Sequence, residues 1–206
     1  AIACADINSD GGINLQNGNG TPTAQDCIIE GNGTYGTSSG TVGGGVEMNG
    51  SAGIIRNCLI RDNVGRRGAG IYCLGSEPTI RNNIIHENRC QGNQGVGGGI
   101  YCDEVSPVFS NCIVWANKRG LFTLVTDSLH ITDSEPNPTV SYSCIEGESV
   151  WPGEGNVSAD PLLVSEGKRA GHFSSFAFEI SILENDNFAR FNAGEKLVEQ
   201  GMLAFL

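Results

Sequence analysis

The feature that most constrains the fold is a repeat that begins with glycines and ends with a short apolar segment closed by asparagine. The copies cover residues 11–32, 43–63, 68–88 and 97–117. The closing asparagines, at intervals of 31, 25 and 29 residues, are Asn32, Asn63, Asn88 and Asn117. A unit this short cannot bury its own apolar side chains, so the copies must stack on one another to share one core.

Each copy contains three apolar segments of three to five residues, separated by Gly, Pro, Asn and Ser. In the last clear copy these segments start near Ile100, Val108 and Ile113. Segments this short predict strands, and the 30 glycines argue against long helices. We therefore predict an all-β fold, a right-handed parallel β-helix over residues 1–164, with coils about 4.8 Å apart.

The end of the chain has a different character. Residues 165–206 hold six of the eight phenylalanines and lack the glycine pattern, and the apolar spacing in 193–206 predicts a helix with Asn192 as its N-cap. The open end of a β-helix exposes strand edges and core, so it requires a cover. We predict that 165–206 forms an irregular, partly helical C-terminal cap, and that 118–135 forms a coil with a different outer loop.

Two repeated positions predict the corners of each coil. Each closing asparagine ends a strand, and Asn tolerates the left-handed conformation that a tight corner requires. Stacking would align these four side chains as an internal amide ladder. The glycine runs 43–45, 68–70 and 97–99 are expected at the opposite corner, where a positive φ or a close approach of coils excludes a Cβ.

The eight cysteines follow the repeat. We expect one inward column to contain Cys27, Cys58, Cys112 and Cys144. We expect a second inward column to contain Cys73 and Cys102, at the positions that Leu15 and Met48 occupy in earlier copies. In-register side chains about 4.8 Å apart are too distant for a disulfide, which needs a Cβ separation of roughly 3.5–4.5 Å, so we expect mostly free, buried thiols. Cys90 is expected in a loop, and the disulfide state of Cys4 and Cys90 stays open.

The charge of the chain limits its partners. A net charge of −11 argues against nucleic acids and anionic membranes, which require clusters of Lys and Arg. No apolar run approaches the roughly 20 residues of a membrane span. The repeat-like pattern already includes Cys4, so we expect the sequence to be a mature or excised part of a longer protein. The oligomeric state stays open.

The outward side chains of the closing strands form a candidate binding column. Its members are Glu30, Arg61, His86 and Trp115. The indole of Trp115 is able to stack on the apolar face of a sugar ring. The alternatives are a solvated ion-pair face at Arg61 and Glu30, and a Trp115 covered by residues 118–135.

The repeat resembles the right-handed parallel β-helix proteins of the pectate-lyase-like superfamily, and it is similar to the repeats of polymorphic outer-membrane proteins. The motifs that carry the resemblance are Gly98-Gly99-Ile100 and Val114-Trp115-Ala116-Asn117, and the other copies have counterparts of both. The resemblance covers roughly residues 10–164. It implies a bacterial-type protein that is secreted or exposed at the cell surface. Relatives of this kind include polyuronate lyases, epimerases, adhesins and passenger domains.

Polyuronate lyases of this fold use an Arg or Lys base and carboxylates that hold Ca²⁺ on one outer face. The candidates for catalysis are Arg56, Arg81 and His86. The candidates for binding Ca²⁺ are Asp62 and Glu87. A glycosidase-like cluster of Asp residues is not present in the sequence.

We therefore predict a secreted or cell-surface module that binds a polysaccharide or a surface protein along an elongated face without catalysing a reaction. Two alternatives stay open. One is a Ca²⁺-dependent polyuronate lyase or epimerase, and only under this hypothesis do we expect a cofactor, Ca²⁺. The other is a structural stalk segment of a larger surface protein.

Overall fold

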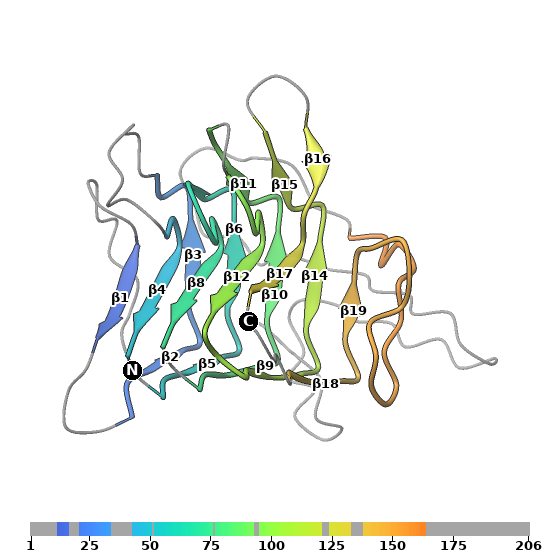
Figure 1. Ribbon diagram of the computed structural model, residues 1–206, viewed down its shortest axis with the longest axis horizontal. Helices are drawn as coiled ribbons and strands as arrows, with labels where there is room; N and C mark the ends of the chain where they lie inside the picture. The colour runs from blue at the N-terminus through green and yellow to red at the C-terminus, as the bar shows by residue number, and fades with distance from the viewer. Residues whose placement is uncertain are drawn as a thin grey trace.

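The computed structural model describes residues 12–16, 21–33, 43–50, 52–75, 77–92, 95–120, 124–132 and 138–163. These residues form a parallel β-solenoid without helices, in which strands of successive coils lie side by side (Figure 1). The predicted all-β parallel solenoid is thereby confirmed. No helix among these residues is long and apolar enough to cross a membrane. The predicted cap and helix in 165–206 lie outside the described residues.

The strands are arranged in four sheets. The first sheet contains β1 (Ile13–Gln16), β4 (Val46–Asn49), β8 (Ile71–Leu74), β12 (Ile100–Asp103) and β17 (Leu129–Thr132). The second contains β2 (Thr23–Gln25), β5 (Ile54–Arg56), β9 (Thr79–Arg81), β13 (Val108–Ser110) and β18 (Thr139–Ser141). The third contains β3 (Ile28–Glu30), β6 (Leu59–Arg61), β10 (Ile84–His86), β14 (Ile113–Trp115) and β19 (Cys144–Ile145). The fourth contains β7 (Val64–Gly65), β11 (Arg89–Cys90), β15 (Lys118–Arg119) and β16 (Val125–Thr126).

The fourth sheet corrects the expectation of three strands per coil. Three of its strands, β7, β11 and β15, have two residues each and follow the ladder asparagines directly, at the start of the loops whose lengths vary between copies. Cys90 lies in β11 and is fully buried, so its predicted place in a loop is wrong. Burial raises the pKa of the Cys90 thiol to about 12, and the thiol donates to the carbonyl oxygen of Val96 at 3.1 Å.

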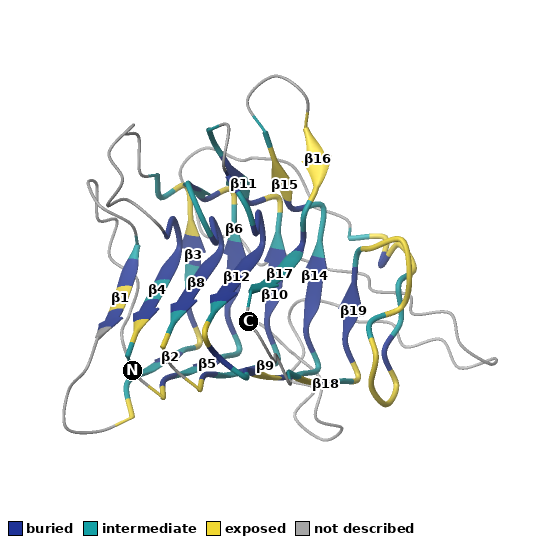
Figure 2. Cartoon of the chain, in the orientation of Figure 1, coloured by how far each residue is buried: buried dark blue, intermediate teal, exposed yellow. Residues whose placement is uncertain are grey.

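The core is formed by the inward residues of the first three sheets, which are dark blue in Figure 2. In each three-residue strand the middle side chain points inward, as do Ile55, Ile85 and Phe109. The register continues past Asn117, because Leu129 pairs with Ile100 and the coil ends in β18 and β19. This confirms the expected coil after 118, whose outer part is the antiparallel pair of β15 and β16.

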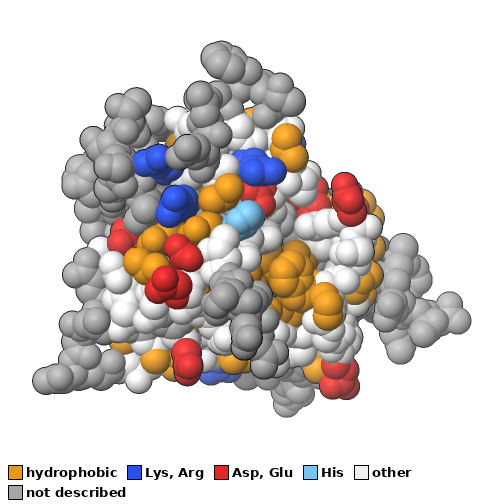
Figure 3. Space-filling view, viewed as in Figure 1, with side chains coloured by type: hydrophobic (Ala, Val, Ile, Leu, Met, Phe, Trp, Pro, Cys, Tyr) orange, Lys and Arg blue, Asp and Glu red, His pale blue; other side chains and the backbone are white. Residues whose placement is uncertain are grey.

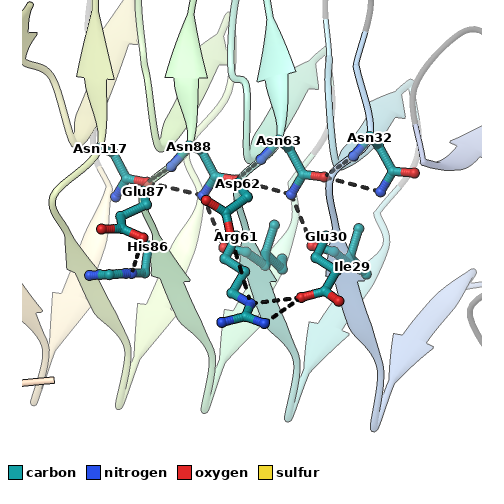
Figure 4. A network of polar contacts seen from close by, with 11 residues as sticks. Ile29, Glu30, Asn32, Arg61, Asp62, Asn63, His86, Glu87, Asn88 and Asn117 are labelled. Atoms are coloured by element: carbon teal, nitrogen blue, oxygen red, sulfur yellow. Dashed lines mark hydrogen bonds and ion pairs between the residues drawn. The ribbon is translucent and has the colours of Figure 1, made fainter. Parts of the chain in front are cut away.

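The predicted amide ladder is present, and Figure 4 shows its four side chains in a row. The Oδ1 atom of Asn88 accepts hydrogen bonds from the backbone N–H and the Nδ2 of Asn63, at 3.1 and 2.9 Å. Asn117 accepts the same pair of bonds from Asn88, both at 3.0 Å. The Nδ2 of Asn88 also donates to the carbonyl oxygen of Ile60 at 2.9 Å. The ladder thus satisfies buried polar groups of two coils at once.

The left-handed residue at this corner is not the ladder asparagine, as predicted, but the residue before it. Positive φ angles occur at Gly31 (68°), Asp62 (54°), Glu87 (54°) and Ala116 (56°). The turn is completed one position earlier, so each ladder asparagine is free to point its amide into the interior. A second corner, between the second and third sheets, has positive φ at Asp26, Asn57, Asn82 and Asn111.

The glycine column packs against the amide ladder rather than at the opposite corner. A Cβ added to Gly45 or Gly70 would lie 2.5–2.6 Å from the carbonyl oxygen of the next coil. The same Cβ would lie 2.9–3.0 Å from the Nδ2 of the ladder asparagine in its own coil. Close approach of coils therefore excludes a side chain at Gly45 and Gly70. At Gly68 and Gly97, a positive φ is a second reason for glycine. Ser128 occupies the next position of this column, in the last coil.

The described cysteines are free and buried, as predicted, and Cys4 lies outside the described residues. Cys27, Cys58 and Cys112 belong to the core, but Cys144 does not share their column. Cys144 pairs with Ile113, which places Ser143 beside Cys112. The sequence alignment matched Cys144-Ile145 to Cys112-Ile113. In the structure Cys144 pairs with Ile113, so the prediction was one residue out of register. In this column, Ser143 Oγ accepts a hydrogen bond from the N–H of Cys112 at 3.1 Å.

Residues 148–163 cover part of the last coil. Trp151 packs against the core, and the Nδ2 of Asn156 donates to the carbonyl oxygen of Val140 at 3.0 Å. The Oδ1 of Asn156 accepts from the N–H of Ser143 at 3.0 Å. Part of the expected covering of this end is therefore supplied before residue 164.

We predict that Asn88→Ala destabilises the fold strongly, because it leaves the backbone N–H and the Nδ2 of Asn63 buried without their acceptor. The expected loss in free energy of unfolding is roughly 2–5 kcal/mol, measured by urea denaturation. Asn82→Gly is the matched control, since it keeps a residue suited to positive φ and removes only a half-buried amide. Equal losses in the two variants would contradict a special role for the inner ladder.

We predict that Gly70→Ala destabilises the fold by about 3 kcal/mol, because the added methyl group meets backbone of the next coil. Gly75→Ala is the control, since a Cβ at Gly75 has no atom within 4 Å and only its φ of 54° opposes the change. We expect the control to lose about 1 kcal/mol. Thermal unfolding of the two variants measures the difference, and similar melting temperatures would contradict it.

Candidate functional site

The four side chains of the candidate binding column lie in register on the outer face of the third sheet, and their role in binding stays a prediction. Glu30 pairs with Arg61, Arg61 with His86, and His86 with Trp115, on strands β3, β6, β10 and β14. Figure 4 shows the first three side chains projecting from neighbouring strands on the same side. Because these strands alternate inward and outward residues, four adjacent coils present one side chain each to the same face.

A salt bridge between Glu30 and Arg61 occupies one end of the column. The Nη2 of Arg61 lies 2.6 Å from Oε2 of Glu30, and its Nε donates to the same oxygen at 2.7 Å. Asp62, at the left-handed corner, lies 4.0 Å from the same Nε. The side chains of Glu30 and Arg61 are 48% and 20% exposed, so solvent screens the pair and it contributes less than about 1 kcal/mol. Its main effect is to hold Arg61 in a fixed orientation.

His86 occupies the centre of the column. Burial lowers the pKa of the His86 imidazole below its ordinary value of 6.5, and the carboxylates of Glu87 and Asp62 oppose this shift. The Nδ1 atom lies 3.7 Å from Oε2 of Glu87. A neutral imidazole carries one N–H donor and one acceptor nitrogen, which suits hydrogen bonding to a hydroxyl group.

Trp115 and a further carboxylate, Glu146, occupy the other end. Trp115 is only partly buried, so the residues after 118 do not cover it completely. Glu146 follows β19, and its Oε2 accepts a hydrogen bond from the N–H of Ala116 at 2.7 Å and from Oγ of Ser128 at 3.3 Å. Sequence reasoning missed Glu146. The pairing of Ile113 with Cys144 and of Val114 with Ile145 places Glu146 beside Trp115, as the next residue of the column.

The candidates for lyase chemistry lie on two different parts of the surface. Arg56 and Arg81 are in register on the second sheet, where the Nε of Arg56 donates to Oε1 of Gln25 at 3.0 Å. Asp62 and Glu87 lie at the corner after the third sheet. Within the described ranges, no group of three or more His, Cys, Asp or Glu side chains is placed to hold a metal ion. The catalytic and Ca²⁺-binding roles stay predictions.

Comparison with known families agrees with this architecture. A family model described as the right-handed β-helix region matches residues 4–141, more than half of the chain. The chain belongs to the right-handed β-helix family. Searches of the curated proteins and of the solved structures found no match to it.

This β-helix also carries an outer amide ladder that sequence reasoning missed. The side chain of Asn57 donates to Oδ1 of Asp26 at 3.0 Å, and Asn82 donates to Asn57 at 3.3 Å. Asn111 continues the row with a 3.3 Å bond to Asn82. The signal was visible, because an Asx residue precedes the cysteine position in four successive copies. These side chains satisfy one another, so this row supports the corner of the β-helix rather than offering a binding site.

A second missed feature is a stack of rings on the outer face of the first sheet. The rings of Tyr72 and Tyr101 are parallel with centroids 5.6 Å apart, and His130 stacks on Tyr101 at the same distance. The guanidinium of Arg67 lies 5.6 Å from the centroid of Tyr101. Both tyrosines are 4% exposed, and their ring faces are occupied by one another. Stacked in this way, they stabilise the β-helix but offer no free ring face to a sugar.

We predict that the His86 imidazole titrates with a midpoint below 6.5, which an NMR titration of its Cε1–H resonance measures. Glu87→Gln is expected to lower the midpoint further, because it removes a carboxylate that raises the pKa. The unfolded chain takes up this proton at a higher pH than the folded chain. Stability is therefore lost as the pH falls below about 6.5, and His86→Gln is expected to remove that part of the loss. A midpoint above 6.5 would contradict the dominance of burial.

Proposed function

We propose that this right-handed β-helix is a secreted or cell-surface module that binds a glycan along the outer face of its third sheet and does not catalyse a reaction. The observation that carries the proposal is the in-register column from Glu30 to Trp115. Coils about 4.8 Å apart place one side chain of the column beside each successive part of an extended chain. Such a column suits a linear ligand better than a compact one.

The chemistry of the column favours a neutral glycan. Its single guanidinium, on Arg61, is already paired with Glu30, and the neighbouring carboxylates are those of Asp62, Glu87 and Glu146. Figure 3, viewed as in Figure 1 with the first sheet in front, shows that acidic and basic side chains are also interleaved on that other side of the β-helix. A polyuronate would place its carboxylates beside these acidic groups, and like charges at short range repel. Hydroxyl groups, by contrast, have donors and acceptors available at His86 and Glu30.

Trp115 supplies the apolar part of the site. It pairs in register with His86 and keeps part of its surface exposed, unlike the two tyrosines of the first sheet, which are stacked and 4% exposed. An indole face packs against the C–H face of a sugar ring, and hydrogen-bonding groups beside it fix the orientation of the ring.

We predict that Trp115→Ala weakens glycan binding roughly ten-fold, the factor that corresponds to 1.4 kcal/mol of ring contact. A glycan array that includes neutral glucans, mannans and galactans selects the ligand, and titration calorimetry measures its affinity. Tyr142→Ala is the matched control, because Tyr142 is an exposed aromatic residue outside the column. We expect this control to bind as the unchanged protein does.

Two outcomes would replace the proposal by one of its alternatives. Release of unsaturated uronate from polygalacturonate or alginate, dependent on Ca²⁺, would identify a lyase and overturn the non-catalytic assignment. An array that retains no glycan would favour a structural stalk.

A further inference from the structure

The outer face of the third sheet carries a second row of side chains, which lies two residues before the binding column. We call this row the apolar stripe. Its members, in register across five coils, are Ile28, Leu59, Ile84, Ile113 and Cys144. These side chains point away from the core, because the residue that follows each of them points inward, as Ile60 and Ile85 do. They form a cluster that is separate from the core.

Four of the five side chains of the apolar stripe are buried although they face outward, and the fifth, Ile28, is partly buried. Leu59 is 3% exposed, Ile84 2% and Cys144 2%. The corresponding row of the second sheet differs, since it contains Val108, which is 43% exposed. A continuous outward row of Ile and Leu is unfavourable in water, so it marks a surface that another segment or molecule covers.

The chain itself runs onto one end of the apolar stripe. Val157 forms a parallel bridge with Cys144, and the Cys144 thiol donates to the carbonyl oxygen of Ala159 at 3.1 Å. Leu163, the last residue that the structure describes, packs against the same cluster. Residues 157–163 therefore cover the Cys144 end of the stripe, and the described part of the chain ends beside it.

We propose that the apolar stripe is the docking site of the C-terminal segment of the same chain, residues 164–206. This segment follows Leu163 directly and contains six phenylalanines, so it begins at the stripe and carries apolar side chains to cover it. The stripe spans four coil spacings, about 19 Å. The helical pattern of 193–206 corresponds to about 21 Å of helix. Four of its apolar positions, at 198, 202, 203 and 206, form one face of that helix.

A second copy of the chain suits this surface less well. A stable interface buries about 800 Å² on each partner, whereas the stripe is a single row of five side chains. A tethered segment, in contrast, has an effective local concentration in the millimolar range and needs less contact area to stay bound. The stripe and the binding column are neighbouring rows of one face, and Trp115 packs against the stripe. The docking is therefore tested in the absence of glycan.

Photocross-linking in the full-length chain tests this docking. We would replace Ile28 and, in a separate protein, Ile84 by p-benzoylphenylalanine, irradiate each protein, and map the cross-linked peptides by mass spectrometry. We expect both positions to cross-link within one chain to peptides from 164–206. The control is p-benzoylphenylalanine in place of Arg81, on the outer face of the second sheet, which should not reach that segment. Retained β-sheet circular dichroism confirms folding in every case.

Substitutions within residues 164–206 provide a second test of the docking. Val198→Asp together with Met202→Asp places charges on the apolar face of the expected helix, and should reduce the cross-link from Ile84 at least five-fold. Cross-linked dimers would overturn the proposal in favour of a second copy. Folded proteins that give no cross-link to 164–206 from either position would also overturn it. Glycan binding by the unchanged protein is scored separately, so failure of one proposal does not conceal failure of the other.

Discussion

The structure depends on how buried polar groups are satisfied where each coil turns. Short parallel strands leave backbone N–H and C=O groups at every corner, and inside the solenoid water is not available to them. The amides of Asn63, Asn88 and Asn117 solve this by bonding to backbone and to one another. Each amide serves two coils, so the corner of one coil is complete only when the next coil is present.

This shared satisfaction explains why glycine and asparagine recur together. Each amide points inward and lies beside the glycine that begins the coil, where a Cβ would meet both the amide and the next backbone. The two residues therefore form one packing unit, although about 18 residues of chain separate Gly70 from Asn88. Apolar side chains of the strands supply the bulk of the buried surface, while this unit sets the register.

Most of the fold could be predicted from the sequence, because the same pattern of apolar, glycine and asparagine positions recurs in four copies. The alternation within strands, the amide ladder, the buried free thiols and the binding column all follow from aligning the copies. The errors came from details that the alignment does not specify. Whether Asn63 or the preceding Asp62 adopts the left-handed conformation depends on backbone geometry, and the two-residue strand at Cys90 is too short to have a periodicity.

The candidate site was less accessible to prediction than the fold. The column from Glu30 to Trp115 follows from period-two alternation, and its register was foreseen correctly. Whether a side chain is exposed, however, depends on parts of the chain distant in sequence, and for that reason the burial of outward Leu59 and Ile84 was not anticipated. Likewise, the N–H of Ala116 bonds to the side chain of Glu146, whereas the equivalent N–H groups of Gly31 and Glu87 bond to backbone carbonyl oxygens. No local sequence pattern indicates this change.

The residue at the end of the glycine column has a consequence for how a further coil could stack. Ser128 carries a Cβ at the position where Gly45, Gly70 and Gly99 carry none. A further coil at the same spacing would bring its carbonyl oxygen against that atom. The close approach of coils that the glycines allow therefore ends at this coil, and a second molecule could continue the stack in register only with a wider spacing at this point.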